Sequence, residues 1–454
     1  MISKFQFLVK LSFSAGLLAL AACTSTSTPV SNENMDVRCS SRTPSCNVLA
    51  GYSGNSVITG IEAATVAGGG LVGLPNMVTG NGGSVGGGTG NTAGEGSTVA
   101  GGSGNTALYF RAAVGGGSAN NAVAEEATVA GGLKNTASDR FAAVGGGASN
   151  LASANYSTVA GGSGNTSSYQ FSTVGGGTEN QSTNEASVVS GGEHNIALGS
   201  FSAVLGGVNN LSSGLSAAIA GGAGNVASGL YAVVPGGFSN QASGDYSFAA
   251  GRNASVGAAD PGTFLFADSS NFLFPSITPN EFAVRAAGGV RFVTALDPAG
   301  NPLSGVRLSP GSGSWESLSD SQAKAAVQPV DGRQVLAALM SIPVSTWSYR
   351  GQDPSIRHIG PMAQDFYSAF HVGTDNRYIS TVDEEGVALA AIQELYRLVQ
   401  QGQVPVNSVS LLNNSALNAQ VSSLQRQLTF SNGLAGASLL IAILALWRRK
   451  KGTR

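Results

Sequence analysis

The chain of 454 residues has few charged residues, few cysteines and few histidines. Only 11% of its residues are charged, and its net charge is -2. Proteins that bind nucleic acids need a basic surface to neutralise phosphates, so we expect no nucleic-acid partner. The three cysteines and three histidines form no group with metal-ligand spacing, and no glycine-rich stretch has the context of a phosphate-binding loop. We therefore expect neither a metal nor a cofactor.

Glycine, in contrast, is abundant, with 65 residues, and many of them belong to a repeat. Ten copies of a fifteen-residue unit read V-x-G-G-x-x-N-x-[A/S], with a β-branched residue six positions before each Asn, as at Val99. The repeated asparagines are Asn105, Asn120, Asn135, Asn150, Asn165, Asn180, Asn195, Asn210, Asn225 and Asn240. A fixed period of this kind predicts stacked coils rather than a single globule.

Each unit has the length of one coil of a β-solenoid. Fifteen residues span roughly 50 Å when extended, which suffices for two short strands and two turns. The glycine pair is expected to adopt backbone angles that side chains forbid, and the Asn to occupy a left-handed turn. The small Ala or Ser two positions after each Asn suits a thin interior. Aromatic residues recur at one position of the expected strand: Phe141, Tyr156, Phe171, Phe201, Tyr231 and Tyr246.

These repeats resemble the left-handed β-roll heads of trimeric autotransporter adhesins. In such heads three chains bury flat apolar faces against one another. The resemblance therefore implies a homotrimeric rod, with a lone β-solenoid as the alternative.

The N-terminal residues have the pattern of an export signal. Lys4 and Lys10 are followed by an apolar run too short to cross a bilayer, which predicts a signal peptide at 1–22. The sequence Leu-Ala-Ala before Cys23 resembles a bacterial lipobox, which implies lipidation of Cys23. Ordinary signal cleavage beside an incidental cysteine is the alternative.

Two further cysteines lie in a polar linker expected at 23–60. Cys39 and Cys46 are seven residues apart in a segment that contains proline. An exported protein meets an oxidising environment, so we expect a local disulfide between them.

The C-terminal residues predict a membrane anchor. The segment 431–447 is largely apolar and is followed by four basic residues, a pattern that favours a transmembrane helix with a cytoplasmic tail at 448–454. A buried terminal helix is the alternative. A coiled coil is expected at 410–430, since apolar residues and one Asn recur there at heptad spacing. Its seam consists of Asn414, Leu417, Val421, Leu424 and Leu428.

Residues 315–400 carry three blocks that together resemble a known family. The blocks are Ser317–Lys324 with the pattern S-D-x-x-x-K, then Pro343–Arg350 and Arg357–Phe366, and finally Ile379–Asp383 leading into Val387–Leu395. In this order they resemble the intramolecular chaperone auto-processing domain that ends phage tail spikes and endosialidases. A protein with a tail-fibre type of C-terminal domain is thus implied.

The resemblance implies that Ser319 is a nucleophile, that Lys324 is its general base and that the Leu318–Ser319 bond is cut. A serine hydroxyl needs a base at neutral pH, and a lysine can serve only if burial or nearby positive charge lowers its pKa. Partner chains are expected to provide that burial. Alternatively, Ser319 only caps a helix. His358, in the second block, either assists the reaction or is simply packed.

Together these features predict a mainly β chain with several parts. They are a trimeric β-roll rod at 61–250, a β neck at 251–314, a small α+β chaperone domain at 315–400, and the C-terminal coiled coil and transmembrane helix. The expected function is a self-processing, adhesin-like surface fibre, exported and membrane-anchored, with a host cell or glycan as ligand and no enzymatic activity in the rod. A surface filament without a ligand and a prophage-derived tail fibre or spike are the alternatives.

Overall fold

A computed structural model describes most of the chain between Val30 and Gly402. The described residues are 30–32, 35–39, 45–402 and 420. Several predicted features lie outside them: the signal peptide (1–22), Cys23, the coiled coil (410–430, apart from Gln420), the membrane span (431–447) and the basic tail (448–454). Among the residues that are described, no helix is both long and apolar enough to cross a membrane. The chain divides into two compact units, one ending at Arg285 and the other beginning at Ala286.

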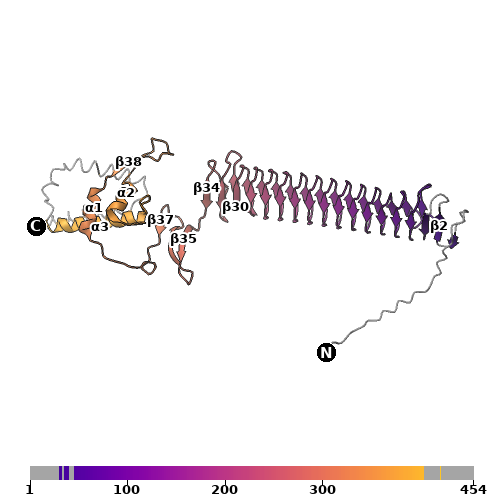
Figure 1. Ribbon diagram of the computed structural model, residues 1–454, viewed down its shortest axis with the longest axis horizontal. Helices are drawn as coiled ribbons and strands as arrows, with labels where there is room; N and C mark the ends of the chain where they lie inside the picture. The colour runs from indigo at the N-terminus through magenta and orange to yellow at the C-terminus, as the bar shows by residue number, and fades with distance from the viewer. Residues whose placement is uncertain (1–29, 33–34, 40–44, 403–419, 421–454) are drawn as a thin grey trace, which may run out of the picture. The chain divides into compact units, whose positions relative to one another are not determined.

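The first unit is a β-solenoid built from two ladders of short parallel strands, as Figure 1 shows. The first ladder consists of β3 (Cys46–Ala50), β5 (Thr65–Val66), β7 (Ser84–Val85), β9 (Thr98–Val99), β11 (Ala113–Val114), β13 (Thr128–Val129), β15 (Ala143–Val144), β17 (Thr158–Val159), β19 (Thr173–Val174), β21 (Val188–Val189), β23 (Ala203–Val204), β25 (Ala218–Ile219), β27 (Val233–Val234), β30 (Phe248–Arg252), β32 (Phe264–Ala267) and β34 (Phe282–Arg285). The second ladder consists of β4 (Ser56–Val57), β6 (Met77–Val78), β8 (Thr92–Ala93), β10 (Thr106–Ala107), β12 (Asn121–Ala122), β14 (Thr136–Ala137), β16 (Leu151–Ala152), β18 (Thr166–Ser167), β20 (Gln181–Ser182), β22 (Ile196–Ala197), β24 (Leu211–Ser212), β26 (Val226–Ala227), β29 (Gln241–Ala242), β31 (Ala254–Val256) and β33 (Phe274–Pro275). The predicted β-solenoid is therefore confirmed.

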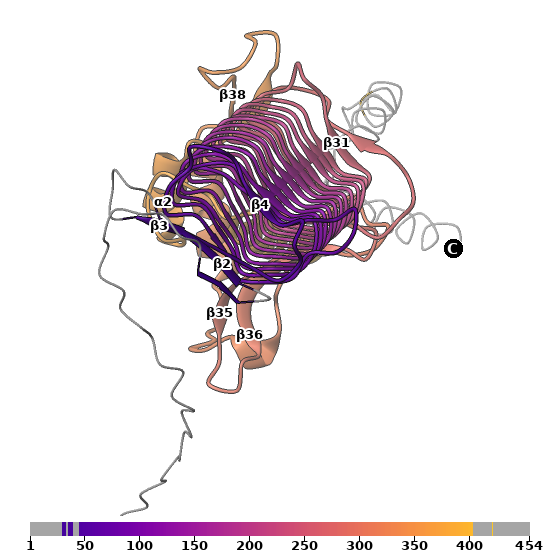
Figure 2. The same cartoon turned by 90° about the vertical axis from the view of Figure 1, so that its right-hand side faces the viewer.

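Successive coils superimpose, as the view along the stack in Figure 2 shows, because equivalent residues pair in register. Val144, for example, pairs with Val129 on one side and Val159 on the other. The repeated β-branched residue points inward and is buried, and the small residue two positions after each Asn is buried as well, as at Ala152 and Ser167. Each coil thus closes a thin core within a single chain.

The parallel stack is longer than the repeats that predicted it at 61–250. It begins at β3 and continues to β34, through strands that were expected to form a separate neck. The rings of Phe248, Phe264 and Phe282 stack in sequence there, with centroids 4.4 and 4.8 Å apart. Paired residues of these coils are more than fifteen positions apart, which explains why the fifteen-residue repeat did not reveal them.

The repeated asparagine has a role that differs from the expected one. The left-handed position belongs to the residue before it, such as Ser149 (φ 57°) or Glu179 (φ 54°), whereas the Asn itself is buried. Asn165 accepts a hydrogen bond at Oδ1 from the N–H of Asn180 (2.9 Å), and its Nδ2 donates to the carbonyls of Gly161 (2.8 Å) and Gly177 (2.9 Å). The same pattern repeats along the rod, so the asparagines form a ladder that joins each coil to the next.

Replacing Asn165 with alanine is expected to destabilise the rod locally by about 2–4 kcal/mol, because the buried N–H of Asn180 and the half-buried carbonyl of Gly161 lose their partners. Hydrogen exchange, read coil by coil, measures this loss. Thr166→Ala, on the outward side of the neighbouring strand, is the matched control and should leave exchange rates nearly unchanged. Equal protection in the two variants would contradict the ladder's role.

The glycine pair includes a backbone conformation that side chains forbid, as expected, and this conformation belongs to its second glycine. Gly162 has a φ of +90°, and a Cβ placed there would overlap the carbonyl oxygen of Gly177 in the next coil. Around Gly161, in contrast, a Cβ would meet nothing within 4 Å. One glycine of each pair is therefore required by both conformation and close backbone approach.

The recurring aromatic residues do not lie in a strand, as the sequence suggested, but at a left-handed turn. Phe141, Tyr156 and Phe171 have φ values of 57°, 57° and 59°. Their rings stack from coil to coil, with centroids 4.6 and 5.3 Å apart. Because each ring covers its neighbour's face, the stack compensates part of the cost of the unfavourable backbone angle.

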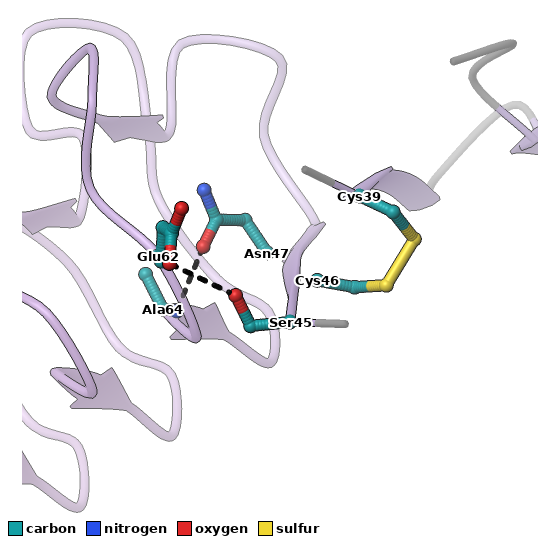
Figure 3. The surroundings of a disulfide bond; sticks show 6 residues. All are labelled: Cys39, Ser45, Cys46, Asn47, Glu62 and Ala64. Atoms are coloured by element: carbon teal, nitrogen blue, oxygen red, sulfur yellow. Dashed lines mark hydrogen bonds between the residues drawn. A yellow bond between two sulfur atoms is a disulfide. The ribbon is translucent and has the colours of Figure 1, made fainter. Parts of the chain in front are cut away.

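A disulfide joins Cys39 to Cys46 at the N-terminal end of the described solenoid (Figure 3). The cysteines are paired residues of two antiparallel strands, β2 (Met35–Cys39) and β3, and β1 (Val30–Asn32) pairs in turn with β2. Beside the disulfide, Asn47 Oδ1 accepts a hydrogen bond from the N–H of Ala64 (2.8 Å). These contacts cover the first coil with an antiparallel pair. A further short strand, β28 (Gly237–Phe238), pairs with β30 near the other end of the repeats.

The second unit is α+β. Three antiparallel strands, β35 (Val290–Leu296), β36 (Pro302–Leu308) and β37 (Trp315–Ser317), are followed by a single 3-10 turn, η1 (Ser321–Ala323). The remaining elements are α1 (Gly332–Ser341), the antiparallel pair β38 (Ser345–Trp347) and β39 (His358–Gly360), α2 (Ala363–Phe370) and α3 (Thr381–Gln400). Helices α1 and α3 pack together. The third sequence block begins just before the long helix α3 and continues along it.

A buried carboxylate links α1 to α3. Glu394 is only 7% exposed and accepts a hydrogen bond from Arg397 Nε (2.7 Å), while Arg333 Nε of α1 lies 3.4 Å from it. The hydrogen bond from Arg397 holds the pKa of Glu394 below its ordinary value of 4.5. A lowered folded-state pKa contributes stability that is present above the unfolded value and is lost as pH falls through the folded one.

We therefore expect Glu394→Gln to lower the unfolding temperature of the second unit by a few degrees at pH 7 and to have a smaller effect at pH 3, because the wild-type carboxylate loses its charge as pH falls through its lowered pKa. Thermal unfolding is followed in the full chain carrying Ser319→Ala, so that only one species is present. Glu385→Gln, at an exposed position of the same helix, serves as the control. A deficit of the same size at both pH values would show that the carboxylate charge does not matter.

Candidate active site

The peptide bond between Leu318 and Ser319 follows the edge strand β37. In this strand Ser317 pairs with Val306 and Glu316 pairs with Arg307, and the N–H of Leu318 donates to the carbonyl of Gly305 (2.9 Å). The chain is thus held extended up to the residue whose carbonyl precedes Ser319. An extended and restrained backbone is the form in which a peptide bond can be presented to a nucleophile.

After Ser319 the chain reverses direction, and this reversal brings Lys324 close to Ser319. Asp320 caps η1 by accepting a hydrogen bond from the N–H of Gln322 (2.8 Å), and the turn ends at Lys324, whose backbone is again extended. As a result Lys324 Nζ lies 2.7 Å from Ser319 Oγ and donates a hydrogen bond to it. Both residues are exposed in the single chain.

This local structure corrects two expectations. The segment after Ser319 is a single 3-10 turn and not the longer helix that a capping serine would begin, and the reversal of the chain in this turn brings Ser319 and Lys324 together. The cap is Asp320 and not Ser319, so capping does not occupy the serine hydroxyl. The alternative in which Ser319 only caps a helix is therefore wrong.

A pocket of about 390 Å³ adjoins the bond. Its lining includes Leu318 and Ser319 together with residues of β35 and β36, among them Arg291 and Arg307. Arg307 Nε donates to Glu316 Oε2 (2.6 Å), and this hydrogen bond lowers the pKa of Glu316 below its ordinary value, so the ion pair persists at neutral pH. Sequence reasoning missed these arginines, because they lie outside the three blocks.

The two segments of the second block pair with each other and do not line this pocket. Pro343–Arg350 contains β38 and Arg357–Phe366 contains β39, and the two strands pair so that Trp347 faces His358. His358 Nε2 lies 2.9 Å from Gln352 Oε1, and its ring packs against Trp347 with a centroid distance of 4.8 Å. The contacts of His358 in the described chain are thus those of a packed, hydrogen-bonded side chain.

The second unit buries little apolar surface by itself. Among its described residues, 286–402 and 420, the buried hydrophobic side chains are Phe366 and Ala391. Val327, Met340 and Ile359, in contrast, expose 76%, 79% and 75% of their surface. The solenoid has instead a continuous core of buried valines and alanines that runs from Ala64 to Ala267. Apolar exposure on this scale is typical of a surface that another chain covers.

Comparison with known proteins places a family at this site. Residues 319–372 match the model of a peptidase family described as chaperone of endosialidase. The matched segment begins at Ser319 itself, and the family implies autoproteolytic peptidase activity in general. No curated protein matches the chain. A β-solenoid followed by such a domain is typical of a tail-fibre-like or spike-like protein and fits a homotrimer. The chain thus carries, after a β-solenoid rod, a C-terminal segment of the chaperone of endosialidase family, as the sequence resemblance predicted.

Proposed function

We propose that this chain is a self-processing, trimeric fibrous surface protein whose C-terminal domain drives assembly and then cuts the Leu318–Ser319 bond. The observation that carries the proposal is the 2.7 Å hydrogen bond from Lys324 Nζ to Ser319 Oγ, directly beside a restrained edge strand. Nucleophile and base are within reach of each other, and the bond to be cut adjoins both.

The reaction follows from these positions. Ser319 Oγ attacks the carbonyl carbon of Leu318 while neutral Lys324 accepts the hydroxyl proton. The bond from that carbon to the Ser319 nitrogen breaks, the nitrogen leaves as an amine after receiving a proton, and an ester between Leu318 and Ser319 Oγ remains. Water then hydrolyses the ester, which yields a Leu318 carboxylate and a chain that begins with Ser319.

Assembly would provide the burial that Lys324 lacks in a single chain. A protonated lysine cannot accept a proton, and burial of an amine favours its neutral form. Lys324 is exposed in one chain, as are the apolar residues of the second unit that a partner would cover. Trimerisation would bury both together, so cleavage is expected only after assembly.

We also propose export and membrane anchoring through the N-terminal signal with lipidated Cys23 and through the C-terminal span. The disulfide between Cys39 and Cys46 supports an oxidising compartment. The adhesin role, with a host cell or glycan as ligand, rests on the resemblance of the repeats to β-roll heads. The cut would release the rod from the C-terminal anchor. A phage-type tail fibre is the second candidate, and the family match at 319–372 favours it.

The test is to express the full chain and to determine both the fragment masses and the assembly state. We expect one new C-terminus at Leu318, one new N-terminus at Ser319, and sedimentation of the rod as a trimer. A monomeric rod would contradict the assembly model, and an intact chain would contradict the cleavage. Binding of the purified rod to cells or glycans would separate an adhesin from an inert filament, and recovery in phage particles would favour the tail fibre.

A further inference from the structure

The three-stranded sheet before the cleavage site carries a row of charged residues that the proposed reaction has not yet used. Arg291 of β35 pairs in register with Arg307 of β36, which pairs in turn with Glu316 of β37. Residues that are directly opposite in adjacent strands project from the same face of a sheet. The row therefore carries two positive charges and one negative charge on one face.

The charges in this row are not balanced. Arg307 forms an ion pair with Glu316, in which Arg307 Nε lies 2.6 Å from Glu316 Oε2. Arg291 makes no side-chain hydrogen bond or ion pair within the described part of the chain. Like charges directly opposite each other in a sheet are destabilising, so an unpaired arginine beside a paired one is a cost unless an anion forms nearby.

An anion does form nearby in the proposed reaction. Attack on the Leu318 carbonyl puts negative charge on its oxygen, and hydrolysis leaves a carboxylate on the same residue. Within the described residues that oxygen accepts no hydrogen bond, although such an oxyanion needs a stabilising group. Arg291 lines the same pocket as Leu318 and Ser319.

We infer that Arg291 supplies the positive charge that stabilises the negative charge on the Leu318 oxygen during self-cleavage; this rests on the proposed function. Arg291 and Leu318 lie on the N-terminal side of the cut, whereas Ser319 and Lys324 lie on its C-terminal side. After the cut, the rod thus keeps the new carboxylate together with its counter-charge. That arrangement holds the product apart from the new amine and disfavours rejoining.

The experiment follows the cleaved fraction over time, as a function of pH, in the full chain with Arg291→Gln or Arg291→Lys. Arg377→Gln, at an exposed position before α3, is the matched control. We expect Arg291→Gln to slow cleavage by at least about tenfold at every pH, without moving the midpoint of the pH profile. Arg291→Lys, which keeps the charge, should recover most of the rate, and Arg377→Gln should cleave as the wild type does.

A wild-type rate in assembled Arg291→Gln would overturn the inference. So would a shifted pH midpoint, because the arginine would then act on Lys324 rather than on the Leu318 oxygen. If sedimentation shows that Arg291→Gln does not assemble, Arg291→Lys becomes the deciding variant. A lysine variant that assembles but is not cut overturns the inference, and one that is cut supports it. The proposed function fails separately, if the wild-type chain itself is not cut.

Discussion

Replacing Ser319 with alanine is expected to leave the chain uncut, with cleavage slowed by more than about 10⁴-fold. Without Oγ no ester can form, whatever the state of Lys324. Lys324→Arg should have a similar effect, because a guanidinium remains protonated and cannot act as a base. Denaturing gels of freshly assembled protein, with time points over days, measure both rates.

Ser321→Ala is the matched control for the serine, since it changes an exposed hydroxyl in the same motif, on η1. It should be cut at the wild-type rate. The uncut variants should also assemble as the wild-type chain does, because assembly precedes the reaction. Normal fragments from Ser319→Ala would remove this residue as the nucleophile, and normal fragments from Lys324→Arg would remove the lysine as the base.

The second large effect is expected in the rod, from Gly162→Ala. The new methyl group would overlap the Gly177 carbonyl and lie 2.5 Å from Asn165 Nδ2, at a φ of +90° that L residues rarely adopt. The left-handed conformation, the overlap and the disturbed hydrogen bonds together should cost about 3–6 kcal/mol. Since each coil contacts only its neighbours, the damage should stay local.

Limited proteolysis measures this break, because a protease should cut Gly162→Ala near the middle of the rod and leave two stable fragments. Gly161→Ala is a control only one residue away. Its Cβ would meet nothing within 4 Å, so it should change stability by no more than about 0.5 kcal/mol and resist the protease as the wild type does. Equal resistance of the two variants would show that close approach of neighbouring coils does not constrain the second glycine.

The repeat correctly predicted the solenoid and its interior, but the roles predicted for the repeated asparagine and the recurring aromatic residue were wrong. The buried Val99 and the buried small residues follow from a two-residue alternation within a fixed period, which any chain of this pattern must obey. The roles of Asn165 and Tyr156 did not follow, because they depend on the coil above and the coil below. An asparagine alone indicates a turn, whereas a column of asparagines forms a hydrogen-bonded ladder.

The candidate site was likewise predicted only in part from the sequence. The blocks identified Ser319 and Lys324, but the alternative role of Ser319 as a cap implied a helix where the chain makes a 3-10 turn. Arg291 was not found, since it lies 28 residues before the serine and outside every block. Only the pairing of β35 with β36, and of β36 with β37, brings it into the pocket beside Leu318.

The sequence by itself determined that the chain is a stack of β-coils followed by a domain with a serine and a lysine in a known pattern, because periodicity and motif are local properties of the chain. Tertiary structure decided which backbone groups the asparagines satisfy, which glycine of each pair admits no side chain, and which arginines line the pocket beside the bond to be cut. These depend on contacts between residues about fifteen or more positions apart, and such contacts are set by the register of neighbouring strands.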